Sequence, residues 1–320
     1  MNSYDKINYK LRTQKRIERA LMVDLINLFN YKVSDNKLNY IGMGSLYFTD
    51  FIYFHKHCTI NEMYSIEYMR DKYGNKDEKK EQRFRSNIPI DKIRLVPKLV
   101  SEAIDDDDLP LGETNFVWYD YDGNFVPAIV DDLEKTIDKM TQTSLLAVSF
   151  NSLVPFSFKE RKNVVDTKKC VDSYKKYMIG SVIDESEFVV DKYAGTAGKI
   201  CEKYLQHIVD DINDCRGTDF KLLRVSRIIY QDGVQMYTYI WAFIDQKKFP
   251  DLESELAKLK IFGEIDLTME NLTLYEKIYL DKHCGELPEV LSDKLGIERT
   301  TVERYYKYAK YIPEFSEIVL

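Results

Sequence analysis

The 320-residue chain has few cysteines, no long apolar run and no excess of positive charge. Its five cysteines are scattered and include no C-x-x-C pair, which argues against a disulfide framework or zinc knuckle and favours a reducing cytoplasm. No apolar stretch approaches the roughly 20 residues that cross a bilayer, and residues 1–10 lack a secretory core, so we expect no membrane association. The formal net charge of −7 argues against bulk electrostatic coating of nucleic acid.

A local excess of positive charge does lie near the N-terminus, where residues 1–20 carry six Lys or Arg against two acids. A helix over residues 10–29 is predicted by apolar residues at helical spacing, namely Ile17, Leu21, Leu25 and Leu28. We expect the charged residues of this segment, among them Arg16, Glu18 and Arg19, to form the solvated face of that helix.

Strands and helices alternate along most of the chain. Short strands are predicted at residues 37–41, 63–67, 92–96, 115–121 and 144–150, with helices at 45–58 and 126–140. Residues 156–214 have a mostly helical pattern with a break near Gly180. Residues 222–230 and 234–244 then form two strands, and the Asp-Gly turn between them indicates a hairpin. This order predicts an α/β, Rossmann-like and mostly parallel sheet with a terminal antiparallel hairpin.

The most informative segment is YIGMGS at residues 40–45, a strand end followed by a G-x-G turn and a predicted helix start. Glycine has no Cβ, so the backbone at Gly42 and Gly44 can approach a ligand closely. Ser45 is the expected N-cap, and the free N–H groups of the helix start favour a polar ligand. Glu67 ends the second strand, where folds of this type use a carboxylate to hold ribose hydroxyls. Together these residues indicate a nucleoside-containing cofactor.

Two aspartates follow the fourth strand. Asp120 lies at the carboxyl end of that strand, where open α/β sheets bind ligands, and is the first candidate for a proton acceptor or substrate orienter. Asp122 is the second candidate, and Phe150 and Asn151 after the fifth strand are expected to line the substrate side. A simpler interpretation makes the aspartates helix caps or turn residues beside Gly123.

Histidines also occur close together, at His55 and His57. They are two apart in a predicted helix, so they point to different sides, and no distant Cys/His pair completes a tetrahedral set. No metal site is predicted, and His55 is expected to be a core residue.

Three segments resemble class I S-adenosylmethionine-dependent methyltransferases, and among them a bacterial group labelled "putative O-methyltransferase". These segments are residues 12–19 (RTQKRIER), 40–55 and 117–123 (VWYDYDG), and the resemblance covers roughly residues 5–245. It implies S-adenosyl-L-methionine as cofactor and methyl transfer to an unidentified acceptor, with O-methylation favoured. The cofactor-binding residues that it implies are Tyr40, Gly42, Gly44, Ser45 and Glu67.

Departures from the superfamily pattern keep an alternative open. Tyr40 stands where an acid is usual, and Leu46 stands where a third glycine is common. The N/D-P-P-Y/F element of enzymes that methylate amino groups on bases is absent, which disfavours that reaction. The alternative is a degenerate methyltransferase fold that binds a nucleotide or DNA as a regulatory module. A different reaction on the same cofactor is a third interpretation, because fold does not fix function.

Residues 266–320 are predicted to form a small all-α domain, after a main domain of residues 1–265 in which residues 1–30 contain the first helix. A helix, an L-G-I turn and a third helix resemble a helix-turn-helix. If this unit binds DNA, the residues facing the groove are Arg299, Thr300, Thr301 and Arg304. Residues 271–320 carry seven Lys or Arg against nine acids, so dimerisation or a protein partner through residues 272–312 is the other interpretation.

Overall fold

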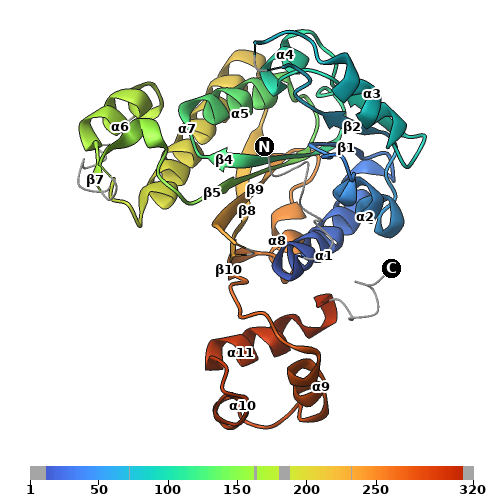
Figure 1. Cartoon of the computed structure of the whole chain (residues 1–320). Coiled ribbons are helices and arrows are strands. Elements are labelled where there is room, and N and C mark those ends of the chain that lie inside the picture. Colours follow the sequence, from blue (N-terminus) through green and yellow to red (C-terminus); the bar gives the residue numbers. More distant parts are fainter. Residues whose placement is uncertain (1–11, 72, 162–163, 180–187, 232, 313–320) are drawn as a thin grey trace.

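The computed structural model describes residues 12–71, 73–161, 164–179, 188–231 and 233–312. Within these ranges the largest sheet has eight strands in the order β10-β8-β9-β5-β4-β1-β2-β3 (Figure 1). Their bounds are β1 Asn39–Gly42, β2 Met63–Ile66, β3 Ile93–Val96, β4 Asn115–Asn124, β5 Ser144–Asn151, β8 Phe220–Gln231, β9 Gln235–Asp245 and β10 Gly263–Asp266. Neighbours from β3 to β5 run parallel, whereas β9 is antiparallel to both β5 and β8. The predicted parallel sheet with a terminal antiparallel hairpin is confirmed.

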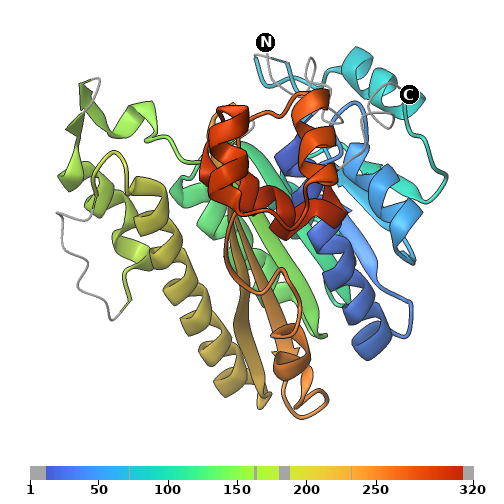
Figure 2. The ribbon, with the colours of Figure 1, turned by 90° about the horizontal axis from the view of Figure 1, so that it is seen from below.

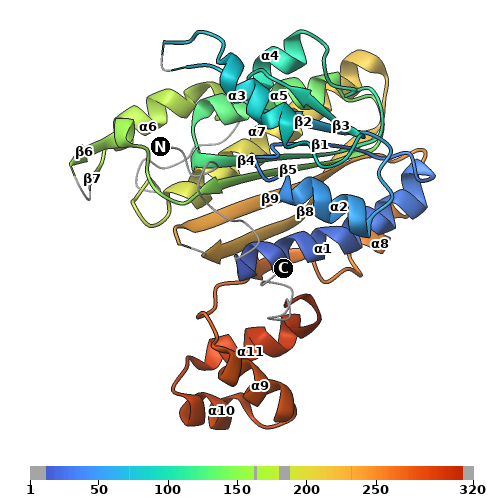
Figure 3. The same ribbon diagram turned by 45° about the vertical axis from the view of Figure 1, so that its right-hand side comes forward.

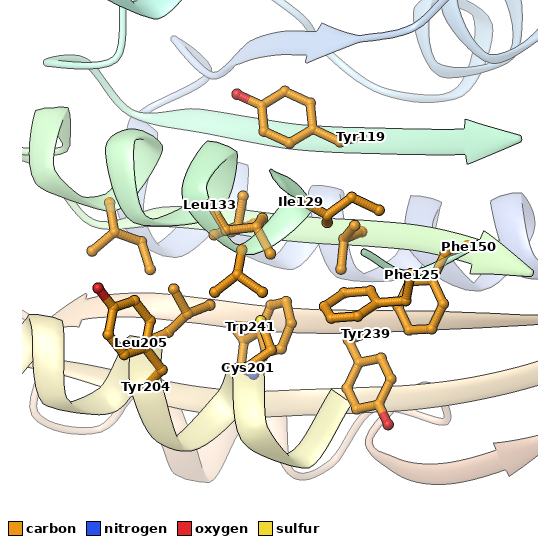
Figure 4. Packing of buried hydrophobic residues seen from close by; sticks show 14 of the residues in the cluster. Tyr119, Phe125, Ile129, Leu133, Phe150, Cys201, Tyr204, Leu205, Tyr239 and Trp241 are labelled. Carbon is orange, nitrogen blue, oxygen red and sulfur yellow. The ribbon is translucent and has the colours of Figure 1, made fainter. Parts of the chain in front are cut away.

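Helices cover both faces of this sheet. One face packs against α4 (Val100–Asp105), α5 (Pro127–Lys139) and α7 (Tyr193–Arg216), and the other against α1 (Thr13–Phe29), α2 (Thr49–His57) and α3 (Glu78–Ser86). Side chains alternate along β4, so Tyr119 faces the α5 and α7 side while Trp118 faces α1. Figure 4 shows the first of these two cores, where Leu133 of α5 and Leu205 of α7 meet the sheet.

The first helix is fastened to the last hairpin. Gln14 Nε2 donates to the carbonyl oxygen of Gln231 at 3.1 Å, and the Gln231 N–H donates back to Gln14 Oε1 at 2.7 Å. These residues lie 217 positions apart. The N-terminal helix is therefore held at the strand end where β8 turns into β9.

Two local predictions at α2 are wrong. The helix begins at Thr49 rather than at Ser45, and its N-cap is Phe48, without a side-chain capping bond. Ser45 and Phe48 have positive φ angles of 50° and 47°, so the turn at residues 45–48 begins and ends with a residue of left-handed φ. His55 is exposed rather than in the core.

The segment between β5 and β8 is less helical than predicted. It contains two short strands, β6 (Lys159–Arg161) and β7 (Val164–Val165), followed by α6 (Thr167–Tyr174) and α7. The break expected near Gly180 lies outside the described residues. Further elements that were not predicted include α4, α8 (Leu252–Leu256) and β10, which pairs in parallel with the outer edge of β8.

Three C-terminal helices form a separate small core. They are α9 (Leu274–Lys282), α10 (Pro288–Leu295) and α11 (Arg299–Tyr308), packed around Leu280, Leu291, Val302 and Tyr305. Figures 1 and 3 show them beyond the α1 side of the sheet, and Figure 2 views the molecule with these helices in front. The chain after α11 returns to α1, where the Tyr311 hydroxyl donates to the Asp24 carboxylate at 2.6 Å.

Candidate active site

A cavity of about 720 Å³ lies beyond the carboxyl ends of β1, β2 and β4. This is the edge at which open α/β sheets bind ligands, and the volume is within the range of small-molecule sites. Its walls come from the turn after β1, the first turn of α2, the end of β2, the start of α4, the end of β4, the first turns of α5 and one side of α1. Five of the residues predicted from the sequence share this cavity: Gly44, Ser45, Glu67, Asp120 and Asp122.

The two glycines of the turn make room for the protein's own side chains. A Cβ added to Gly42 would overlap the hydroxyl of Tyr40, and one added to Gly44 would lie 2.7 Å from Phe48 Cδ1 and from Ser65 Oγ. The Gly44 N–H also donates to Ser65 Oγ at 3.2 Å. Other atoms do pack closely against the backbone at both glycines, as expected. They belong to side chains of the protein and not to a ligand.

Tyr40 lies in the core beneath the turn. Its ring makes edge contacts with Phe51 and Phe54 of α2, with ring centroids 4.8 and 5.1 Å away, and burial raises its pKa well above the usual value. Neither Tyr40 nor Gly42 lines the cavity. Their positions give no support to the expected contact with a cofactor, and Tyr40 replaces the usual acid with a packing residue.

Glu67 connects the turn to β2. Its Oε1 accepts hydrogen bonds from the Ser45 N–H at 2.8 Å and from the Ser65 hydroxyl at 3.3 Å. Burial raises the pKa of Glu67 to about 7, against the opposing effect of the Ser45 N–H. The side chain is half-buried and lines the cavity, so a ligand can reach a carboxyl group that changes charge near neutral pH.

Asp120 is held by a buried lysine of α1. Lys15 Nζ lies 2.9 Å from Asp120 Oδ1, 3.0 Å from Glu18 Oε2 and 2.9 Å from the Tyr230 hydroxyl. The same ammonium lies 4.3 Å from the centroid of the Trp118 ring, within cation–π range. The Lys15 and Glu18 side chains are 1% and 0% exposed, whereas Asp120 is 17% exposed and lines the cavity.

The predicted solvated face of the first helix is therefore wrong for Lys15, Glu18 and Arg19, which are all buried. Burial lowers the pKa of Lys15, but the carboxylates of Asp120 and Glu18 outweigh it, so this pKa lies well above the usual value. Burial raises the pKa of Glu18, partly offset by Lys15. The segment at residues 12–19 carried the family resemblance, and that was the available signal for a role at the site.

Arg19 and Asp50 form a second buried ion pair that sequence reasoning missed. Arg19 Nε donates to Asp50 Oδ1, and the two side chains are 2% and 8% exposed. Both residues line the cavity, as does Thr49 beside them. Tyr121 and Asp132, also missed, form a hydrogen-bonded pair on the cavity wall, with the Tyr121 hydroxyl donating to Asp132 at 2.6 Å.

The two residues predicted to line the substrate side do not reach this cavity. Phe150 is buried in the core against Phe125, with ring centroids 4.5 Å apart (Figure 4). Asn151 donates to the carbonyl oxygen of Asp122 at 3.2 Å and accepts from Asn124 at 2.8 Å. Both residues shape the ends of β4 and β5 instead.

Acidic residues 105–108 form ion pairs with three lysines, Lys98, Lys135 and Lys139. In the part of the chain that the structure describes, no group of three or more His, Cys, Asp or Glu side chains is arranged to hold a metal ion.

Two of the four C-terminal residues expected to face DNA make contacts within the protein instead. Thr301 is 1% exposed and accepts a hydrogen bond from the Glu270 N–H at 3.2 Å. Arg304 donates to the Thr268 carbonyl oxygen and pairs with Asp266. These two residues therefore face the segment that joins the C-terminal helices to β10.

Arg299 and Thr300 remain exposed at the start of α11. Arg299 forms ion pairs with Glu289 and Glu303, both at 2.6 Å. DNA contact by this helix thus stays a prediction, and the geometry favours a structural role for half of its expected contact residues.

One family model matches this chain. The family model described as "Putative O-methyltransferase" matches residues 7–320. No curated protein matches the chain. Solved structures with similarity include a "putative O-methyltransferase" from Klebsiella pneumoniae (11% identity, 74% of this chain and 84% of that chain, TM-score 0.36). A protein of the NADB-Rossmann superfamily from Streptococcus agalactiae is 13% identical over 95% of both chains, with a TM-score of 0.35.

A third solved structure is the O-methyltransferase TomG from Streptomyces achromogenes, in complex with SAM. It is 10% identical over 74% of this chain and 90% of that chain, with a TM-score of 0.35. At these scores the three structures add no argument about the site, and the assignment rests on the family match.

Proposed function

Because the chain belongs to the family described as "Putative O-methyltransferase", we propose that its cavity binds S-adenosylmethionine and that it methylates an oxygen nucleophile. The observation that carries this proposal is the meeting of the glycine turn, Glu67 and Asp120 in one cavity at the carboxyl edge of the sheet. The acceptor is not identified by any of these residues.

The residues present suit the cofactor in their placement and charge. Glu67 at the end of β2 is placed to accept hydrogen bonds from ribose hydroxyls, next to the backbone of Ser45. Five carboxyl groups line the cavity against two cationic side chains, Arg19 and Lys98; the five are Asp50, Glu67, Asp120, Asp122 and Asp132. An acidic lining suits a ligand whose sulfonium and ammonium groups outnumber its single carboxylate.

When bound, S-adenosylmethionine supplies a methyl group on sulfonium sulfur that an acceptor oxygen displaces in line. The task of the protein is to position that oxygen and to take its proton. Asp120 is the residue for this task, because its carboxylate reaches the cavity from the end of β4. Lys15 acts through Asp120 as a positioning residue, since it holds the carboxylate from the buried side.

Asp122 is the second candidate in the same role. It lines the cavity and is exposed, and its carbonyl oxygen accepts a hydrogen bond from Asn151. An exposed carboxylate suits contact with an acceptor at the mouth of the cavity. We assign the reaction to the cytoplasm, which the five free cysteines support. In the described ranges, no helix has the length and apolar character needed to cross a membrane.

The test is calorimetric titration of the whole chain with S-adenosylmethionine and S-adenosylhomocysteine, beside the variant Glu67→Ala. Micromolar binding by the wild type, weakened at least about tenfold in the variant, supports the assigned site. Absence of binding to the wild type contradicts the proposal. An assay of labelled methyl transfer to hydroxyl-bearing acceptors then identifies the acceptor class.

A further inference from the structure

We propose that Arg19, Thr49 and Asp50 form a receptor for an α-amino acid group, and that its occupant is the amino-acid end of the cofactor. This inference rests on the proposed function, and it adds the residues that recognise the part of the cofactor farthest from the nucleoside. All three residues line the cavity, and two of them belong to the first turn of α2.

The guanidinium of Arg19 is only partly used within the protein. Its side chain is 2% exposed, and Nε donates to Asp50 Oδ1. Among the described residues no acceptor is found for Nη1 or Nη2, the two nitrogens that form the other edge of the planar group. Buried arginines normally use several of their five donors, and the free edge of a guanidinium matches a carboxylate in bidentate geometry.

Asp50 and Thr49 show the same incomplete pairing. The Asp50 side chain is 8% exposed. Its Oδ1 accepts from Arg19, and within the described ranges its Oδ2 has no hydrogen-bond donor. The hydroxyl oxygen of Thr49 is buried and has no hydrogen-bond partner in the described part of the chain. Buried polar groups are rarely left unsatisfied. The buried Thr49 hydroxyl, beside guanidinium nitrogens and a carboxylate oxygen that also lack partners among the described residues, therefore points to a polar ligand at this cavity wall.

The chemistry of the three groups defines that ligand. A guanidinium edge binds a carboxylate, a carboxylate oxygen binds an ammonium, and a hydroxyl serves either. Because Arg19 and Asp50 are in contact, the two complementary charges of the ligand must also be adjacent. An α-amino acid group has this arrangement on a single carbon, whereas a phosphate or a simple amine satisfies only one member of the pair.

The experiment compares two probes that differ in this group. S-adenosylhomocysteine carries the α-amino acid end, and methylthioadenosine retains the nucleoside and sulfur but lacks it. We expect the wild type to bind S-adenosylhomocysteine about 10- to 100-fold more tightly, as charge-assisted hydrogen bonds would give. The double variant Arg19→Gln/Asp50→Asn removes both charges together, so no buried charge is left unpaired.

In that double variant the preference for S-adenosylhomocysteine should fall to within about twofold, while the affinity for methylthioadenosine stays near that of the wild type. Arg19→Lys keeps the charge but not the planar fork and should retain part of the preference. The matched control is Arg94→Gln/Glu62→Gln, which removes an exposed ion pair away from the cavity. Thermal unfolding of each variant checks that it is folded.

Three results would overturn the inference. They are equal affinity of the wild type for the two probes, an unchanged preference in the double variant, and an equal loss of affinity for both probes. The first two leave the nucleoside site, and with it the proposed function, intact. A wild type that binds neither probe contradicts the proposed function together with the inference.

Discussion

Lys15 Nζ lies 2.9 Å from Asp120 Oδ1 and joins the N-terminal helix to the fourth strand at the edge of the cavity. The ammonium approaches from the buried side, while the carboxylate retains 17% exposure toward the cavity. This arrangement separates the two roles. Asp120 can touch a ligand, and Lys15 fixes where the carboxylate stands.

Asp120→Asn should lower the rate of methyl transfer by about 100- to 10,000-fold, the usual contribution of a general base, with little change in cofactor affinity. The amide has nearly the same shape but cannot take a proton. Single-turnover transfer of a labelled methyl group measures the effect. Asp122→Asn is the matched control, expected to lose less because its side chain is exposed. Full activity of Asp120→Asn would remove this residue from the mechanism.

Lys15→Met should destabilise the protein by about 3–5 kcal/mol, because Glu18 and Asp120 lose their shared cation in a buried site. The pKa of Lys15 is raised in the folded state, so its stabilising contribution is complete at neutral pH and is lost only in strongly alkaline solution. Urea unfolding measures the difference.

The control for Lys15→Met is Lys135→Met, which breaks an exposed pair with Asp105 and should cost no more than about 1 kcal/mol. Equal losses in the two variants would show that the buried position of Lys15 confers no special role.

Glu67 should make stability and binding depend on pH. Its pKa is about 7 when folded, above the ordinary value, so the native protein holds an extra proton between about pH 4.5 and pH 7. Stability from this group is therefore complete below that window and decreases as the pH rises through it. Glu67→Gln should lack this decrease, which urea unfolding at about pH 5 and pH 8 measures.

Binding gives a second readout for the same residue. If the ionised carboxylate holds ribose hydroxyls, cofactor binding near pH 6 must release a proton from Glu67. Calorimetry in two buffers of different ionisation enthalpy detects that release in the wild type, and Glu67→Gln should show none. A proton release of equal size in both proteins would assign it to another group.

Gly44→Ala should destabilise the turn by about 1–3 kcal/mol, because the added methyl group meets Phe48 and Ser65 at 2.7 Å. Gly123→Ala is the control, since no atom of the described residues outside its chain neighbours lies within 4 Å of the position its Cβ would take. The control should change stability by less than about 0.5 kcal/mol. Thermal unfolding of the ligand-free protein distinguishes this packing effect from loss of ligand binding.

The elements that could be predicted from the sequence are those with local signals. Alternating strands and helices and the Asp-Gly turn predicted the sheet and its hairpin, and the methyltransferase assignment is confirmed by the family match. The turn before α2 shows why local sequence signals did not predict where this helix begins. Ser45 looked like an N-cap, but its N–H bonds to Glu67 on the neighbouring strand and its φ is positive.

The charged residues of the first helix could not be placed from periodicity. Glu18 and Arg19 follow the pattern of a solvated face, and their burial depends on partners far along the chain. Lys15 forms hydrogen bonds with Asp120 on β4 and with Tyr230 on β8. These partners lie 105 and 215 positions later in the chain. A pattern of apolar positions within one helix contains no information about such partners, and the family resemblance of residues 12–19 did not predict them either.

The two hydrogen bonds between Gln14 and Gln231 have a consequence for folding during synthesis. Lys15 and Arg19 leave the ribosome early, but the strand that secures their helix emerges more than 200 residues later, as the 217-residue separation dictates. Until then the first helix lacks this pair of hydrogen bonds and relies on earlier partners such as Asp50 and Asp120. A chain that terminates before residue 231 should therefore contain every residue that lines the cavity, and still hold the α1 wall less firmly.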